Sequence, residues 1–113
     1  MHEMAITQSM VNLVLEEARK GGARRVTSIS LVLGELSGVV GDCVELYFGL
    51  MSRDTPAEGA AISIKSVPTR ARCRKCAREF EVKDLDWICP ECGSVSVELV
   101  AGHELFVESI EVE

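Results

Sequence analysis

Four cysteines in two closely spaced pairs constrain this sequence more than any other feature. The first pair reads Cys-Arg-Lys-Cys, the second reads Cys-Pro-Glu-Cys-Gly, and twelve residues separate them. Each Cys-x-x-Cys pair is typical of a tight turn that points both sulfurs the same way, so two such turns can enclose one ion. Four thiolates with no open position favour Zn²⁺ in a closed tetrahedral site. The sequence therefore predicts a structural zinc site whose ligands are Cys73, Cys76, Cys89 and Cys92.

Disulfides and an iron site are the alternatives for these cysteines. The N-terminus shows no basic segment or continuous apolar run of a signal peptide, and no apolar stretch is long enough to cross a bilayer. We therefore expect a cytoplasmic protein whose thiols are reduced and bind a metal. A rubredoxin-like electron carrier would use similar turns to bind iron and would be red when purified. The fifth cysteine, Cys43, lies in an apolar context, which predicts a small buried side chain.

The charge balance argues against a dedicated nucleic-acid-binding protein. The 113 residues include 12 Lys or Arg and 18 Asp or Glu, for a net charge of −6. A basic cluster surrounds the first cysteine pair and comprises Arg70, Arg72, Arg74, Lys75, Arg78 and Lys83. We interpret it as compensation for the negative charge of a four-thiolate zinc centre. The main alternative function is a zinc-ribbon adaptor that uses this cluster to bind nucleic acid or a transcription component. The sequence shows no nucleophile and base pair and no open metal position, so we do not expect an enzyme.

Two segments have the apolar spacing of amphipathic helices. The first covers 3–20 and ends before a pair of glycines, which predicts a left-handed C-terminal cap. The second covers 42–51. Asp42 and Glu45 at its start predict a capping box, in which each side chain satisfies a backbone N–H group of the first turn.

Three segments have the pattern of strands, and they predict an α+β fold. They are 26–34, 61–67 and 105–113, the last with a bulge or twist midway. We expect them to form a small mixed three-stranded sheet, covered by the two helices, with a zinc-ribbon lobe inserted between the second and third strands. Phe80 and Trp87 would form the small core of this lobe. The predicted domains are 1–69 plus 99–113, which form the α/β part, and 70–98, which forms the zinc ribbon.

Three short motifs occur in a specific order along the chain. They are Met1-His2-Glu3, Gly34-Glu35-Leu36-Ser37-Gly38-Val39, and the two cysteine pairs with Gly93-Ser94 after the second. Together they resemble the HypA/HybF nickel metallochaperones of hydrogenase maturation, and the resemblance spans essentially the whole chain. It implies that His2 binds Ni(II), that the cysteines hold structural zinc, and that a hydrogenase maturation GTPase, HypB-like, helps to deliver nickel to the [NiFe]-hydrogenase large subunit. Urease accessory proteins and a homodimer stay open as further partners, whereas nucleic acid and membranes are not expected as partners.

The first three residues have a nickel-binding geometry of their own. The α-amine of Met1 and the amide and imidazole nitrogens of His2 supply three corners of a square plane, which suits Ni(II) or Cu(II) better than Zn²⁺. The amide or the carboxylate of Glu3 could supply the fourth corner. We assign Met1, His2 and Glu3 to the nickel site and leave out His103, the other histidine. The alternative is a solvated, frayed terminus without a metal.

The glycine-rich segment 34–38 has two interpretations. Its glycines suit a strand-to-helix connection in which they relieve backbone strain. Alternatively, Glu35 and its neighbours form a surface for the GTPase or for the metal site. We favour the first interpretation for Gly34 and Gly38, and we expect the first helix to contact the GTPase.

Overall fold

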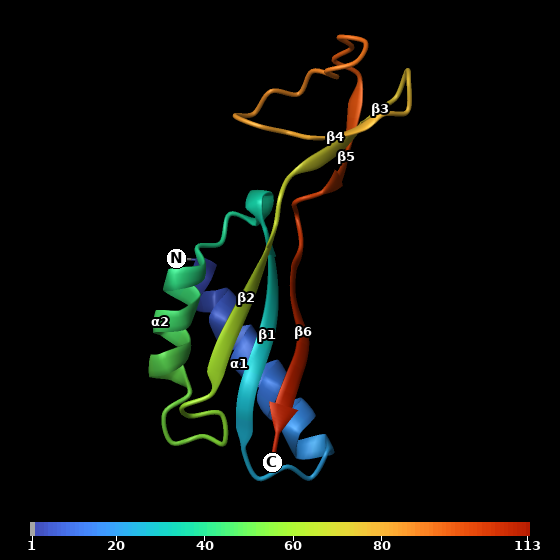
Figure 1. Ribbon diagram of the computed structural model, residues 1–113. Helices are drawn as coiled ribbons and strands as arrows, with labels where there is room; N and C mark the ends of the chain where they lie inside the picture. The colour runs from blue at the N-terminus through green and yellow to red at the C-terminus, as the bar shows by residue number, and fades with distance from the viewer. Residues whose placement is uncertain (1) are drawn as a thin grey trace. The chain divides into compact units, whose positions relative to one another are not determined.

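The computed structural model describes residues 2–113, with side chains from Glu3 onward. The elements in chain order are α1 (His2–Lys20), β1 (Val26–Gly34), the 3-10 helix η1 (Glu35–Ser37), α2 (Gly41–Met51), β2 (Ala61–Val67), β3 (Arg70–Cys73), β4 (Glu79–Glu81), β5 (Val97–Ala101) and β6 (Leu105–Val112). They form two compact units (Figure 1). The first comprises the segments up to Val32, Val39–Lys65 and Phe106–Glu113, and the second comprises Leu33–Gly38 and Ser66–Leu105.

A mixed three-stranded sheet with β1 at its centre confirms the predicted fold class. The strand order is β2-β1-β6. In Figure 1 the chain enters β1 and β2 at the same end of the sheet, whereas β6 runs the opposite way. Arg25 and Glu113 exchange backbone hydrogen bonds of 3.2 and 2.9 Å in both directions, as expected for antiparallel strands.

Helical spacing predicted the buried face of α1 only in part, because Leu13 is 49% exposed, and it predicted the wrong face for α2, where Leu46 and Leu50 are 63% and 50% exposed. The helix α1 runs across the strands behind the sheet in Figure 1, and it contacts α2. The buried apolar side chains of the unit are Met10, Val11, Val14 and Ala18 from α1, Val44 and Phe48 from α2, Val26, Ile29, Leu31 and Val32 from β1, and Ala57 from the segment before β2. The central strand is the most buried of the three, because it has a neighbour on both sides. No helix in the described part of the chain is long and apolar enough to span a membrane.

The predicted C-terminal cap of α1 is confirmed, and the predicted N-terminal capping box of α2 is wrong. Gly22, which follows α1, has the left-handed conformation expected of a C-terminal cap, with φ 68°. The helix α2 begins at Gly41, and no side chain caps its N-terminus, so the capping box of Asp42 and Glu45 does not form. Asp42 instead lies in the first turn, where its negative charge interacts favourably with the helix dipole.

The second unit contains an antiparallel sheet of order β4-β3-β5. Its buried cluster contains Ala71, Cys73, Phe80, Val82 and Cys89, and the half-buried Trp87 and Val97 pack against it. Phe80 and Trp87 therefore belong to the core, as predicted. The strand β3 was not predicted, because its Arg-Ala-Arg-Cys sequence is dominated by charge; Ala71 and Cys73 point inward, and the arginines between them do not.

The glycine-rich segment is tightly packed within this second unit. A Cβ atom on Gly34 would lie 2.1 Å from the carbonyl oxygen of Gly102, so no larger residue fits there. The amide of Leu36 donates to the same oxygen at 2.6 Å. The Glu35 carboxylate accepts hydrogen bonds from the amide and the hydroxyl of Thr69 at 3.3 and 3.0 Å. Close packing therefore explains Gly34, which the sequence left with two interpretations.

We predict that Gly34→Ala lowers the free energy of unfolding by about 1–3 kcal/mol, because the added methyl group overlaps backbone that cannot move without breaking these hydrogen bonds. The matched control is Gly49→Ala inside α2, where an added Cβ meets nothing within 4 Å. This control should stabilise the chain by about 0.5–1 kcal/mol, because alanine is the better helix residue. Thermal unfolding followed by circular dichroism measures both. Equal melting temperatures for Gly34→Ala and the parent chain would contradict the packing argument.

Candidate metal centre

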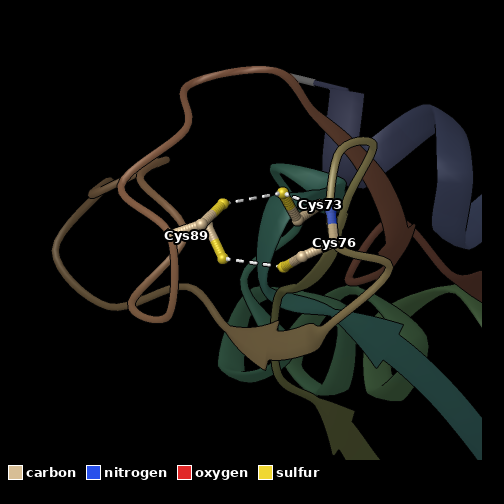
Figure 2. Close-up of side chains that lie close together, drawn as sticks. Cys73, Cys76 and Cys89 are labelled. Atoms are coloured by element: carbon tan, nitrogen blue, oxygen red, sulfur yellow. Dashed lines mark hydrogen bonds between the residues drawn. The ribbon is translucent and has the colours of Figure 1, made fainter.

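The four cysteines of the two pairs lie together in the second unit. Their four Sγ atoms all lie within 4.8 Å of one another. No other group of three or more His, Cys, Asp or Glu side chains among the described residues is placed to hold one metal ion. The Sγ atoms of Cys73 and Cys92 are 3.5 Å apart, and those of Cys76 and Cys89 are 3.6 Å apart (Figure 2). Sulfurs that bind one zinc ion at about 2.3 Å with tetrahedral angles lie about 3.8 Å apart. The donor set therefore fits a tetrahedral metal site.

The two cysteine turns have nearly the same backbone hydrogen bonds. The amide of Ala77 donates to the carbonyl of Cys73, and the amide of Gly93 donates to the carbonyl of Cys89, both at 2.9 Å. A second 2.9 Å bond closes each turn, from Cys73 to Arg78 and from Cys89 to Ser94. In each turn the first cysteine is buried and the second is exposed. The centre is therefore built from two equivalent halves.

Backbone amides hold the buried sulfurs and favour their charged form. The amides of Cys76 and Lys75 lie 3.5 and 3.4 Å from the Cys73 sulfur. These contacts lower the pKa of Cys73 to about 6, against the opposing effect of burial. The amides of Cys92 and Glu91 lower the pKa of Cys89 in the same way.

The pKa values of the two exposed cysteines, Cys76 and Cys92, are raised instead. The amide of Arg78 lowers the pKa of Cys76, but burial and hydrogen bonds with the neighbouring thiols outweigh it and raise the pKa to about 12. For Cys92, contact with the Cys73 sulfur and burial likewise outweigh the amide of Ser94 and raise the pKa. Without a metal, the cluster thus holds two sulfurs that ionise easily and two that do not. A bound cation would favour the thiolate form of all four.

Part of the basic cluster is paired with carboxylates. Arg72 contacts Glu79 at 2.7 Å and Glu98 at 3.5 Å, and Arg78 contacts Glu91 at 3.1 Å. The hydrogen bond from Arg72 also lowers the pKa of Glu79. These arginines therefore have carboxylate partners on the surface of the unit, which leaves less positive charge for binding nucleic acid.

The predicted nickel ligands lie at the other end of the chain. Met1 and the side chain of His2 lie outside the described residues, so this site stays a prediction. Glu3 lies in the first turn of α1, and its carboxylate accepts a hydrogen bond from the amide of Val40 at 3.4 Å. Hydrogen bonds from its own amide and that of Val40 lower the pKa of Glu3, so it is charged at neutral pH. Cys43, predicted to be buried, is only half-buried.

One residue of the centre escaped the sequence analysis. Ala77 has φ 66°, a left-handed conformation that costs a residue with a side chain about 1–2 kcal/mol. Gly93 occupies the same position in the second turn, with φ 73°. The sequence does contain the signal, because a glycine follows the second cysteine pair and an alanine follows the first.

We predict that Ala77→Gly binds zinc more tightly, because glycine adopts the required backbone conformation without strain. The reverse change, Gly93→Ala, should weaken binding, although an added Cβ there meets nothing within 4 Å. Each effect should be about 1 kcal/mol, roughly a fivefold change in affinity. Competition with a chelator measures both. Identical affinities for the two variants and the parent would show that the left-handed turn position does not contribute.

We also predict that zinc binding weakens as pH falls, because protons compete for the sulfurs. With the pKa of Cys76 near 12 and that of Cys92 raised, these two groups are protonated at pH 8 and must lose their protons to bind. Below the pKa of Cys73, near 6, a further proton must leave and the pH dependence should steepen. Calorimetry in two buffers of different ionisation enthalpy should give at least two protons released per zinc at pH 8, those of Cys76 and Cys92. Release of none would contradict the assignment.

Known proteins resemble this chain over its whole length. The family model described as "Hydrogenase/urease nickel incorporation, metallochaperone, hypA" matches residues 1–112. Hydrogenase maturation factor HypA of Geobacter metallireducens is 45% identical over 113 residues, which cover both chains completely. The protein of the same name from Dehalococcoides mccartyi strain 195 is 40% identical and is covered to 95%.

Solved structures support the fold. A structure described as "Solution structure of HypA protein" aligns with a TM-score of 0.76 and 24% identity, covering 100% of this chain and 97% of the other. The Ni metallochaperone HypA from Helicobacter pylori aligns with a TM-score of 0.66 and 23% identity, covering 97% and 96%. Because the family match extends from the first residue through both cysteine turns, this chain belongs to the HypA family of hydrogenase and urease nickel-incorporation metallochaperones.

Proposed function

We propose that this chain binds Ni(II) at its N-terminus and, with a partner GTPase, delivers it to the large subunit of [NiFe]-hydrogenase. The observation that carries the proposal is the single family match that includes both Met1-His2-Glu3 and the four-cysteine centre. Relatives that are 40–45% identical are named hydrogenase maturation factors. The family description also names urease, so we include urease accessory proteins as possible recipients. A cytoplasmic location suits this function.

The proposed nickel ligands are Met1, His2 and Glu3. The helix α1 begins at His2, and the first amides of a helix have no acceptor within the helix. A metal can therefore take amide nitrogens there without breaking a helical hydrogen bond. The charged Glu3 carboxylate accepts a hydrogen bond from its own amide and would offset part of the ion's positive charge. All of these ligands compete with protons, which suits a carrier that must release its cargo.

The proposed role of the four cysteines is structural. Zn²⁺ held by Cys73, Cys76, Cys89 and Cys92 would supply folding free energy, because the apolar core around it is small. Four protein sulfurs leave no position for a substrate. We accordingly assign nickel binding to the domain 1–69 plus 99–113 and zinc binding to the domain 70–98. The ion pairs of Arg72 and Arg78 and the burial of Phe80 favour this function over a nucleic-acid adaptor.

We predict that His2→Ala weakens nickel binding by at least about 100-fold, because loss of a direct ligand costs more than loss of an outer-shell partner. Zinc content and melting temperature should not change. Calorimetry on untagged protein, with absorption spectra of the nickel complex, measures the effect, and His103→Ala is the matched control. A short peptide fused ahead of Met1 should also weaken nickel binding, since it removes the α-amine. Equal nickel affinity for His2→Ala and the parent would refute the site.

A further inference from the structure

Two close sulfur contacts in the centre run between the two turns. Cys73 and Cys92 form one pair at 3.5 Å, and Cys76 and Cys89 form the other at 3.6 Å (Figure 2). A disulfide needs about 2.05 Å, so each pair must approach by about 1.5 Å.

The pairing of exposed and buried sulfurs gives each pair an accessible reactant and a protected partner. Cys73 and Cys89 are 1% exposed, whereas Cys76 and Cys92 are exposed. Each contact between the turns joins one sulfur of each kind. A small oxidant in solution therefore reaches one member of each pair first, and the buried member is already in contact with it.

The positions of the pairs in the chain decide what their disulfides would do. Cys76 and Cys89 lie 13 positions apart in the chain and Cys73 and Cys92 lie 19 positions apart, so one loop lies inside the other. Closing a loop of this length stabilises a fold by restricting the unfolded chain. Disulfides within each Cys-x-x-Cys turn would leave the two turns unconnected. Only links between the turns can replace a metal as the crosslink of this unit.

We propose that the cysteine centre is a reversible redox switch in which peroxide converts the four thiolates into two disulfides, Cys73–Cys92 and Cys76–Cys89, with release of the metal and retention of the fold. The proposal rests on the zinc site proposed above. The switch would set the zinc content of the protein according to the oxidant level, while leaving the unit able to bind zinc again after reduction.

The chemistry balances with hydrogen peroxide as the oxidant. The exposed thiolate attacks one peroxide oxygen, the O–O bond breaks, and a sulfenic acid and water form after one proton is taken up. The buried thiolate then attacks the sulfenic sulfur, the S–O bond breaks, and the disulfide forms as hydroxide leaves and takes up a second proton. For the whole centre, four thiolates, two peroxides and four protons give two disulfides and four waters. The zinc ion leaves because its ligands are consumed.

The test uses the full-length, untagged, zinc-loaded protein with Cys43→Ser, which removes the fifth thiol without touching the centre. Metal analysis before oxidation establishes that zinc is bound. Hydrogen peroxide is then added, a zinc indicator follows release, and the disulfides are mapped by mass spectrometry without reduction. Trypsin cuts after Arg74 and Lys75, which separates Cys73 from Cys76, and a glutamate-specific protease cuts after Glu91, which separates Cys89 from Cys92.

The expected result is release of one zinc per chain, a loss of four hydrogens from the chain mass, and linked peptides that join Cys73 to Cys92 and Cys76 to Cys89. Adding a thiol reductant and Zn²⁺ should restore the original state. Disulfides within the turns, a Cys73–Cys89 link, or irreversible sulfinic acids would overturn the proposal. So would an oxidised protein whose β3 and β4 amides exchange as fast as those of the reduced, chelator-treated protein. Nickel binding by the untagged parent protein is measured separately. It distinguishes failure of the redox switch from failure of the proposed chaperone function.

Discussion

The convergence of four sulfurs on one point is the constraint on which the second unit depends. Two of the five residues in its buried cluster, Cys73 and Cys89, are also members of the sulfur group. The rest of the cluster is small, and a core of this size does not usually stabilise a fold alone. The ligands of the metal and the packing of the core are therefore partly the same side chains. Folding and metal binding in this unit should be one process.

Much of the fold follows from local patterns in the sequence. The helix α1, the central strand β1 and the cysteine turns were predicted because their spacing or alternation is complete within a short segment. The strand β3 was missed because charged residues alternate with the small inward-facing Ala71 and Cys73. The capping box failed because the N-cap of α2 is Val40, two residues before Asp42. Local rules do not register contacts made by distant segments, such as that of Glu35 with Thr69.

The two predicted metal sites rest on different kinds of evidence. Spacing alone predicted the four-sulfur site, and the structure brings those four residues together with distances that suit a tetrahedral ion. Cysteine spacing by itself did not register that the two turns differ at Ala77 and Gly93, although the residue after each cysteine pair carries that signal. The N-terminal site rests on chelate chemistry and on family membership, because a three-residue motif carries little information by itself. Glu3, the described member of that motif, is charged and held by the amide of Val40.

The contact of Gly34 with Gly102 has a consequence for how sequences of this kind can change. Gly34 has no room for a methyl group against Gly102, and a Cβ on Gly102 would lie 2.8 Å from the Cα atom of Thr69. Three segments far apart in the chain thus exclude any larger side chain from one small volume. Substitution of either glycine should therefore destabilise the fold even in a chain that no longer binds a partner protein. Invariance of these glycines among relatives would therefore be explained by steric exclusion and, at Gly102, also by its φ of 121°.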